Sequence, residues 1–445
     1  MKVLWKALRI FLYLCLMNGA LLRERTALSG PGFAALMAAL FVFYAVSLVL
    51  PETEKGSGAR LAVMKGGHTL ILSAALCFVF EALLYAGVFG AAKISVSWQT
   101  ALINGIAALL LASFMMFVGF VRIIFTSTQL GIVTRLLLLL TWWIPVWNLF
   151  LFFRACGLVR REYHYEMARQ ELNQARKENE VCGTKYPILL VHGIFFRDWQ
   201  LLNYWGRIPR ELMRNGASVY YGEQQSAAPV SRSGEELAAR IREILEAEGC
   251  EKVNIIAHSK GGLDSRYAIS RLGMGQHVAS LTTINTPHRG CVFAERLLKL
   301  FPEGLVRFIA DKYNAVFRKL GDREPDFLGG VLDLTAGRCA RFNEEVRDDD
   351  RVYYQSVTSK MKGMFSFGFP LIFTYPIVKF VEGENDGLVT PDSAKWGNFL
   401  GLVTGSGYRG VSHGDMVDLM RENIAGFDVK EFYVNIISGL KERGL

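Results

Sequence analysis

One serine stands where a strand is expected to turn sharply into a helix. Residues 253–262 read Val-Asn-Ile-Ile-Ala-His-Ser-Lys-Gly-Gly, an apolar run that ends in Ser259 and continues into a glycine pair. This is the pattern of a nucleophile elbow, which holds a serine in a strained backbone conformation and exposes its hydroxyl. The usual form is Gly-x-Ser-x-Gly. Ala257 replaces the first glycine here and is small enough for strand and helix to pass closely. The alternative is a serine in an ordinary turn after a strand.

A base must accompany the serine, because its hydroxyl is a poor nucleophile until its proton is removed. Of the seven histidines, His413 has the best position, late in the chain in Gly-Val-Ser-His-Gly-Asp (residues 410–415). In α/β hydrolases the chain order is serine, then acid, then histidine. His258 directly precedes the serine, so its side chain should point away from the hydroxyl.

The acid that orients the histidine should lie between these two residues, on a loop after a late strand. Asp386, in an Asp-Gly turn before an apolar pair, fits best, and Glu384 and Asp392 are its rivals. Asp386 would fix the tautomer of His413 and stabilise its imidazolium form. A solvated aspartate in a turn is the alternative.

The tetrahedral intermediate of such chemistry needs N–H donors for its oxyanion. One is the backbone amide of Lys260, the residue after the nucleophile. The other is expected in Val-His-Gly-Ile-Phe (residues 191–195), after the first strand. There Gly193 lets the chain turn, so that the Ile194 amide faces the oxyanion. Both are backbone roles that do not specify side chains.

Strands and helices alternate around these residues from Pro187 onward. This alternation predicts a doubly wound, mostly parallel sheet, in which ligands bind outside the carboxyl ends of the strands, where Ser259 falls. The expected strands are Ile188–Val191, Ser218–Tyr221, Lys252–Ala257, Val278–Ile284 and Tyr353–Thr358. The expected helices are Pro209–Asn215, Gly234–Glu248 with Ser231 or Ser233 as its N-cap, and Leu263–Leu272.

An insertion from about residue 291 to residue 335 interrupts the alternation with short amphipathic helical pieces. It is interpreted as a cap over the site that supplies an acyl-binding groove, and a plain structural subdomain is the alternative. Thr335 is expected to cap a short helix that ends near Val346. The apolar stretch Met361–Phe380 fits either a surface that lies on lipid or core around the site.

The N-terminal third of the chain has the composition of a membrane region. Hydrophobic residues make up 51% of the chain, and residues 1–157 carry +8 of the net charge of +9. Residues 1–27 favour a basic interfacial helix, with a short extra span as the alternative. Four later stretches are each long enough to cross a bilayer core of ~30 Å. They are roughly Phe33–Leu50, Leu70–Ala91, Ala101–Ile124 and Val133–Phe153, the last with a kink expected at Pro145.

These features divide the chain into a membrane region (residues 1–157), a charged helical linker (158–184) and a hydrolase domain (185–445). Lys and Arg at both ends of the membrane region favour a cytoplasmic catalytic domain. Glu81 lies inside the second span and must face protein or water; a packed, protonated carboxyl and a functional one both satisfy this condition.

Some functions are excluded by the same composition. The chain beyond residue 157 is close to neutral, so the positive charge belongs to the membrane flanks and does not predict nucleic-acid binding. Seven scattered cysteines form no CxxC or Cys/His cluster, so no zinc site is expected, and they fit reduced thiols. Apart from Glu81 the spans offer few ionisable residues for a transport pathway.

Five motifs together resemble those of bacterial triacylglycerol lipases of the α/β-hydrolase fold, the Pseudomonas/Burkholderia and Staphylococcus group, and the elbow is similar to that of Bacillus lipases. They occur in the same order, in residues 191–194, 257–262, 285–290, 385–389 and 412–415. The resemblance covers roughly Tyr186 to Val417 and implies ester hydrolysis through an acyl-enzyme, with Ser259, Asp386 and His413 as the triad. In that group an aspartate two residues after the catalytic histidine helps to bind a structural calcium, and Asp415 has this position; no other cofactor is implied.

The sequence therefore predicts a membrane-anchored serine lipase or esterase that acts on lipid esters. Its expected partners are the lipid substrate and the bilayer, and no nucleic-acid partner is expected. An acyltransferase or thioesterase with the same triad is the near alternative. A non-catalytic membrane scaffold that retains the fold, or a transporter regulated by it, is the distant one. The oligomeric state, the natural ester and its chain length are not specified by these patterns.

Overall fold

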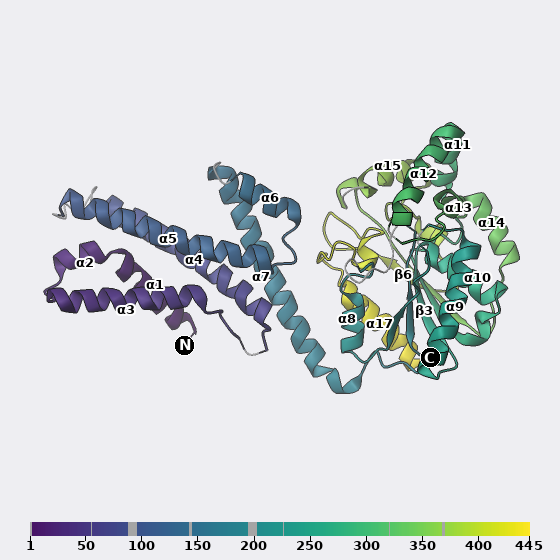
Figure 1. The fold of residues 1–445 in the computed structure, drawn as a ribbon, viewed down its shortest axis with the longest axis horizontal. Coiled ribbons are helices and arrows are strands. Elements are labelled where there is room, and N and C mark those ends of the chain that lie inside the picture. Colours follow the sequence, from purple (N-terminus) through teal and green to yellow (C-terminus); the bar gives the residue numbers. More distant parts are fainter. Residues whose placement is uncertain are drawn as a thin grey trace. The chain divides into compact units, whose positions relative to one another are not determined.

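The computed structural model describes residues 2–54, 56–87, 96–141, 145–194, 203–225, 227–319, 321–366 and 370–445. The chain divides into two units, Met1–Leu172 and Asn173–Leu445. The first is helical, and the second contains a sheet with helices on both faces (Figure 1).

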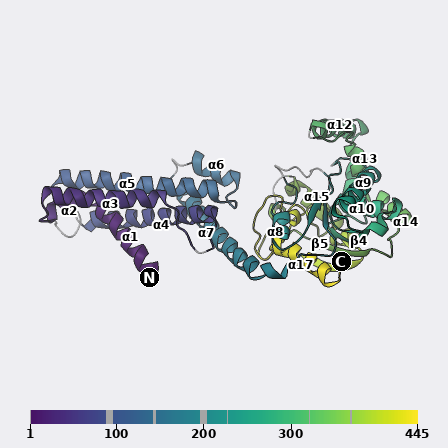
Figure 2. The same cartoon turned by 60° about the horizontal axis from the view of Figure 1, so that its bottom comes forward.

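The N-terminal unit is built from seven helices within the described part of the chain. They are α1 (Lys2–Met17), α2 (Gly19–Arg25), α3 (Gly30–Val49), α4 (Ala59–Ala86), α5 (Trp98–Thr126), α6 (Ile132–Leu140) and α7 (Pro145–Ala175). Three of them, α3, α4 and α5, are long and apolar enough to cross a membrane, and these three run side by side in Figures 1 and 2. The pair α1–α2 is bent by 78°, and it passes the same test if it is counted as one broken span.

The fourth expected span differs from the structure. Of residues 133–153, the described part lies in α6, which ends at Leu140, and in α7, which begins at Pro145. The nine residues of α6 reach about 14 Å, less than half of the ~30 Å hydrocarbon core. Pro145 is the first described residue of α7, and residues 142–144 before it lie outside the described part of the chain, so the kink expected at Pro145 stays a prediction.

A chain of polar side chains joins the apolar helices. The Asn18 amide donates to Glu81 Oε1 at 2.5 Å, and the Asn104 amide donates to Asn18 Oδ1 at 2.9 Å. Glu81 is 8% exposed and therefore faces protein, as expected for a carboxyl within an apolar helix. These bonds tie the α1–α2 bend to α4 and α5, because polar groups in apolar surroundings are stable only when they are paired.

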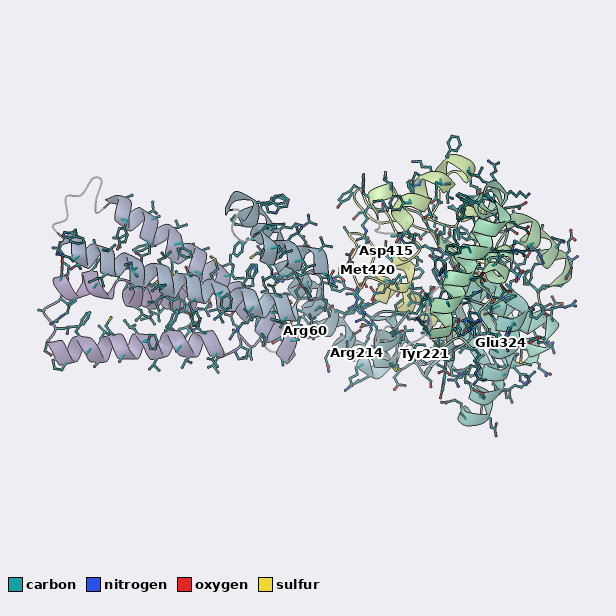
Figure 3. The ribbon with its side chains drawn as sticks, turned by 45° about the horizontal axis from the view of Figure 1, so that its top comes forward. Arg60, Arg214, Tyr221, Glu324, Asp415 and Met420 are labelled. Carbon is teal, nitrogen blue, oxygen red and sulfur yellow. The ribbon has the colours of Figure 1, made fainter. Side chains whose placement is uncertain are left out.

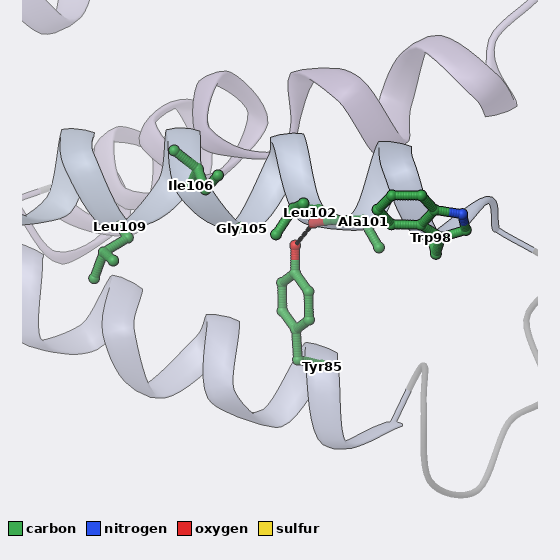
Figure 4. A pocket seen from close by; sticks show the side chains of 7 residues that line it. All are labelled: Tyr85, Trp98, Ala101, Leu102, Gly105, Ile106 and Leu109. Carbon is green, nitrogen blue, oxygen red and sulfur yellow. Dashed lines mark hydrogen bonds between the residues drawn. The ribbon is translucent and has the colours of Figure 1, made fainter.

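The helices α4 and α5 also meet near the C-terminal end of α4. The Tyr85 hydroxyl donates to the Ala101 carbonyl at 2.7 Å, as Figure 4 shows. Gly105 makes this approach possible, because a Cβ at that position would lie 3.0 Å from the Tyr85 oxygen. Tyr85 and the facing residues of α5 line a shallow apolar pocket, which extends from Trp98 to Leu109.

A buried carboxylate fixes α7 within the N-terminal unit. Glu162 is 1% exposed, and its Oε1 accepts from Arg60 at 2.7 Å (Arg60 is labelled in Figure 3). Its oxygens also accept from the Ser127 and Thr128 hydroxyls and from the backbone amide of Gln129. Such full pairing compensates for the loss of hydration of the carboxylate.

The C-terminal unit contains one parallel sheet of six strands in the order β2-β1-β3-β4-β5-β6. The strands are β1 (Ile188–Val191), β2 (Val219–Tyr221), β3 (Val253–His258), β4 (Val278–Ile284), β5 (Tyr353–Ser359) and β6 (Asn398–Val403). The first five agree with the sequence analysis within one or two residues. The edge strand β6 was not expected, because its sequence contains a glycine and carries no continuous apolar run.

Helices cover both faces of this sheet, because side chains alternate along each strand. Ile188 and Leu190 of β1 pack against α8 (Ile208–Arg214) and α17 (Val429–Glu442). Leu189 and Val191 of the same strand pack against α9 (Val230–Glu248) and α10 (Lys260–Arg271). Figure 1 shows the two pairs of helices on opposite sides of the strands. The continuous apolar sequence of β1 follows from burial on both faces.

The N-terminus of α9 differs from the expectation. The helix begins at Val230, after Pro229, and neither Ser231 nor Ser233 is its N-cap. The Val230 amide instead donates to Asp333 Oδ2 at 2.8 Å, an acceptor about a hundred residues away in the sequence. A carboxylate at a helix N-terminus accepts an otherwise unpaired N–H and interacts favourably with the helix dipole.

The inserted segment forms α11 (Val292–Leu300), α12 (Glu303–Lys319) and α13 (Phe327–Leu332). Thr335 then precedes α14 (Ala336–Glu345), as expected, although its hydroxyl donates back to the Leu332 carbonyl. The later helices are α15 (Leu371–Glu382) and the short α16 (Pro391–Ala394). Aromatic rings hold the insertion together, with Tyr313 and Phe327 stacked at 4.6 Å between ring centroids.

Candidate functional site

Ser259 lies at the turn between β3 and α10, at the carboxyl edge of the sheet. Its backbone has φ 55° and ψ −131°, a conformation that costs a residue with a side chain about 1–3 kcal/mol. The Ser259 amide donates to the Ile284 carbonyl at 2.9 Å, which anchors the turn to β4. The strained turn of a nucleophile elbow is therefore present at the serine selected from the sequence.

Three glycines make room for this turn. A Cβ at Gly193 would lie 2.8 Å from the Ser259 Cβ, and one at Gly261 would lie 2.4 Å from the His192 carbonyl oxygen. A Cβ at Gly262 would lie 2.2 Å from the Thr286 hydroxyl. These distances are shorter than any normal carbon contact, so the small residues of the elbow are required by close packing.

His413 and Asp386 form a hydrogen-bonded pair. His413 Nδ1 lies 2.7 Å from Asp386 Oδ2, and the His413 amide donates to the Asp386 carbonyl at 2.8 Å. The other carboxylate oxygen of Asp386 accepts from the amides of Leu388 and Val389 at 2.9 and 2.7 Å. The carboxylate is fully buried, and its rivals Glu384 and Asp392 instead pair with Lys360 and Lys395.

His258 supports the backbone of His413. Its Nδ1 lies 2.6 Å from the Tyr204 hydroxyl, and its Nε2 lies 3.2 Å from the His413 carbonyl oxygen. Burial holds the pKa of His258 well below its usual value, so the ring is neutral. A neutral ring satisfies both contacts when Nδ1 accepts from Tyr204 and Nε2 carries the hydrogen.

This support also reaches the loop after β1. The Gly193 amide donates to the Tyr204 oxygen at 3.2 Å, so Tyr204 and His258 connect that loop to the histidine loop. The ring centroids of His258 and His413 are 4.4 Å apart. His258 thus packs against the candidate base, which its position before the serine did not indicate. Tyr204 had no sequence signal, because it lies outside every motif.

The two expected oxyanion donors lie beside the serine. Ile194 lines the same cavity as Ser259, and Lys260 is the first residue of α10. Within the described part of the chain, neither backbone amide donates to a protein acceptor. Both are thus available to an oxygen bound at Ser259. Phe195, which follows Ile194 in the same motif, lies outside the described residues.

The side chain of Lys260 has a separate role. It is 1% exposed, and its Nζ donates to Asp264 Oδ1 at 2.7 Å and to the Ser233 hydroxyl at 2.9 Å. Burial raises the pKa of the Asp264 carboxyl to about 6, although Lys260 opposes this effect. The ion pair lies within the first turn of α10, and the hydrogen bond from Lys260 to Ser233 links the start of α10 to α9 next to the elbow.

A cavity of about 310 Å³ opens at Ser259. Its walls are almost entirely apolar and come mainly from the inserted helices α11, α12 and α13, through side chains that include Phe293, Leu297, Val306, Ile309, Phe327 and Val331. Ligand sites in proteins typically combine such an apolar wall with a few polar groups. The insertion predicted from residues 291–335 therefore supplies the apolar wall of the site.

Asp415, the position that the resemblance associates with calcium, has other partners. Its Oδ1 accepts from Arg409 Nη2 at 2.9 Å, and its Oδ2 accepts from the Ser412 amide at 2.9 Å. Arg409 also pairs with Glu422 at 2.6 Å. Figure 3 labels Asp415 and Met420 in this loop region between β6 and α17. These residues do not fit a calcium ion, because a guanidinium already occupies the carboxylate and a second cation beside it would be repelled.

Comparison with known proteins agrees with this geometry. Residues 186–367 match the family model of the alpha/beta hydrolase fold. The chain is 39% identical over 175 residues to triacylglycerol lipases of Pseudarthrobacter phenanthrenivorans and Burkholderia plantarii, an alignment that covers 36% of this chain and 54% and 48% of those proteins. The chain thus spans about half the length of these relatives.

Solved structures are more distant in sequence. The Staphylococcus hyicus lipase is 17% identical, with a TM-score of 0.46, over 59% of this chain and 98% of that one. The resemblance inferred from the five motifs is thus confirmed by the family model and by the sequence relatives. The C-terminal unit is an α/β-hydrolase domain that is similar to bacterial triacylglycerol lipases.

Proposed function

We propose that this chain is a membrane-anchored serine hydrolase that cleaves carboxylic esters of lipids through an acyl-enzyme intermediate. The observation that carries this proposal is the strained Ser259 in the wall of an apolar cavity, together with a buried Asp386–His413 pair at 2.7 Å. A lipid ester has an apolar acyl chain next to a polar reacting carbonyl. The cavity is complementary to it, because an apolar wall lies next to the polar group of Ser259.

The proposed mechanism follows from the chemistry of these groups. Ser259 Oγ attacks the ester carbonyl while His413 takes its proton, and Asp386 holds the histidine in the tautomer that accepts at Nε2. The amides of Ile194 and Lys260 stabilise the oxyanion. His413 then returns the proton to the leaving alcohol, which leaves the acyl group on Ser259. Water, activated by His413, releases the fatty acid and regenerates the serine.

The helical unit supports the membrane part of the proposal. Three helices long and apolar enough to span a bilayer would hold the hydrolase unit at its substrate surface. The Lys and Arg residues that flank this region favour a catalytic unit on the cytoplasmic side. Alkaline extraction of membranes tests the anchor, since a spanning chain stays in the pellet and a peripheral one is released.

Covalent labelling tests the nucleophile. The full chain in detergent micelles is treated with a fluorophosphonate, digested and mapped by mass spectrometry. The expected result is a single adduct on the peptide that contains Ser259, because an activated serine attacks the probe as it attacks an ester. Absence of an adduct, with hydrolysis of p-nitrophenyl esters also absent, would favour a scaffold that kept the fold. An adduct together with faster acyl transfer than hydrolysis in the presence of an alcohol would favour an acyltransferase.

Filling the cavity should shorten the preferred acyl chain. Ala294 of α11 lines the cavity, and Ala294→Trp introduces an indole where the chain is expected to lie. We expect kcat/KM for p-nitrophenyl laurate to fall by about tenfold or more and that for the acetate to stay within about twofold, since each displaced methylene contributes about 1 kcal/mol or more. Leu300→Trp is the matched control, because Leu300 lies on the same helix but is 75% exposed and outside the cavity. Equal losses on both esters would contradict the assignment of the cavity to the acyl chain.

We further propose that Arg409 takes the place of a structural calcium beside His413. Hydrolysis and the thermal unfolding midpoint should then be unchanged by EDTA. Arg409→Ala should lower stability by about 2 kcal/mol, because it leaves the buried Asp415 carboxylate without its cation; this is less than for a fully buried pair, since the Arg409 side chain is 22% exposed. Thermal unfolding of the two proteins, each with EDTA and with added calcium, measures both effects. A fall in the midpoint of the unmodified chain on EDTA treatment would restore the calcium interpretation.

A further inference from the structure

A second cavity, of about 620 Å³, lies within the N-terminal unit and is far larger than a single water requires. Its walls come from α1, from residues 65–76 of α4 and from α7, with Glu54 from the loop before α4. No residue that lines it belongs to the C-terminal unit, so its interpretation does not depend on the proposed hydrolysis. The basic and histidine side chains on its wall are Lys6, Arg9, Lys65, His68, Arg160 and His164.

Two of these cations are neutralised within the protein. Lys65 forms an ion pair with Glu54, and its ammonium also lies over the Tyr163 ring. Arg9 Nη1 lies 3.7 Å from Glu52 Oε1. These pairs hold the two carboxylates in place and account for the acidic groups near the cavity.

The other two cations are uncompensated. Lys6 and Arg160 have no acidic partner among the described residues. His68 and His164 line the same cavity and add ring nitrogens that can donate hydrogen bonds. The cavity therefore has a surplus of positive charge, and an anion with several acceptor oxygens, such as a phosphate group, is complementary to it.

The cavity changes from basic to apolar along α4. Lys65, Thr69, Leu72 and Leu76 all line it, and their spacing places them on one face of the helix. From Lys65 to Leu76 the helix rises by about 16 Å, which is about half of the hydrocarbon core of a bilayer. Leu72 and Leu76 are 46% and 53% exposed, so the apolar part of this stripe is uncovered.

The change from basic to apolar side chains along the cavity matches a membrane lipid, which has a charged head group next to apolar acyl chains. The helix α4 is one of the three that can span a bilayer, and the basic end of the cavity lies at its beginning. We propose that the cavity binds an anionic phospholipid, with its phosphate at Lys6 and Arg160 and one acyl chain along Leu72 and Leu76. An interfacial cation next to an apolar stripe is the arrangement that such a lipid requires.

Lipid binding to the full chain tests this proposal. The protein in detergent micelles is titrated with phosphatidylglycerol, phosphatidylcholine or inorganic phosphate, and bound ligand is measured by native mass spectrometry. We expect phosphatidylglycerol to bind at least about tenfold more tightly than phosphatidylcholine, because only the former leaves its phosphate charge uncompensated. Equal binding of the two lipids would overturn the charge argument, and binding of inorganic phosphate as tight as that of the lipid would show a small-anion site instead.

Paired variants locate the site. Lys6→Gln/Arg160→Gln should weaken phosphatidylglycerol binding about tenfold or more, since it removes two charge-assisted contacts from exposed side chains. Lys6→Arg/Arg160→Lys keeps the charge and should retain binding, which separates loss of charge from misfolding. Arg154→Gln/Arg161→Gln is the matched control, because these exposed residues lie on α7 outside the cavity. Equal losses in the control and the cavity variant, or no loss in either, would refute the site.

Discussion

Ester hydrolysis by the Ser259→Ala variant is expected to fall by about 10⁴-fold or more in kcat, because removal of the nucleophile leaves only binding and oxyanion stabilisation. The apolar cavity and the oxyanion amides do not depend on the hydroxyl, so KM should change little. Initial rates on p-nitrophenyl butyrate, measured with the full chain in detergent, give both parameters. Ser270→Ala, on the same helix, is the control and should keep the full rate.

The same position also tests the strain of the elbow. Ser259→Gly should be as inactive as Ser259→Ala. Its free energy of unfolding should nevertheless be higher than that of Ser259→Ala by about 1 kcal/mol or more, because glycine adopts φ 55° without steric cost. Activity and stability would then be opposed at one residue, as is expected where strain exposes a nucleophile. Retention of more than a tenth of the activity by Ser259→Ala would show that another group attacks the ester.

Lys260→Met should destabilise the C-terminal unit by about 3–5 kcal/mol, because it leaves the carboxylate of Asp264 buried without its cation. For a unit of this size the thermal midpoint would fall by about 10 °C. The backbone amide of Lys260 remains, so the expected oxyanion donor is unaffected. Thermal unfolding of the full chain followed by circular dichroism measures the shift.

A double variant and a pH series separate the ion pair from packing. Lys260→Met/Asp264→Leu should regain most of the lost stability, because no buried charge is left unpaired. In Lys260→Met the deficit should shrink as the pH falls from 7 towards 5. The pKa of Asp264 is already raised to about 6 with the lysine present, and it rises further without it, so protonation favours the folded state in this window. A deficit that is independent of pH would assign the effect to lost packing.

In the membrane region, the local sequence pattern predicts some helices correctly but does not predict where others end or bend. Apolar stretches of twenty or more residues predicted α3, α4 and α5, because a helix that crosses lipid must be apolar along its whole length. The stretch 133–153 is equally apolar, but most of its described residues belong to two helices, α6 up to Leu140 and α7 from Pro145, and residues 142–144 lie outside the described part of the chain. At the N-terminus, Asn18 lies at the bend between α1 and α2 and contacts Glu81, a residue 63 positions away in the sequence.

In the α/β unit, too, some elements could be predicted from the local sequence and others depend on distant contacts. Buried strands such as β1 and β4 are visible in the sequence, because burial on both faces demands a continuous apolar run. The edge strand β6 is half exposed and follows from its pairing with β5. The cap of α9 could not be foreseen, because Ser233 is buried against Lys260 and a distant Asp333 accepts the first helical N–H.

The sequence by itself was enough to predict the elbow serine, the chain order of the acid and the histidine, and the two candidate oxyanion amides. Each of these depends on residue type and chain order, which local turn chemistry makes readable. Only the tertiary structure decided that Asp386, and neither Glu384 nor Asp392, contacts His413, that Tyr204 and His258 support the histidine loop, and that Arg409 occupies Asp415. These choices depend on side chains that approach one another across long stretches of sequence, where no local periodicity specifies the partner.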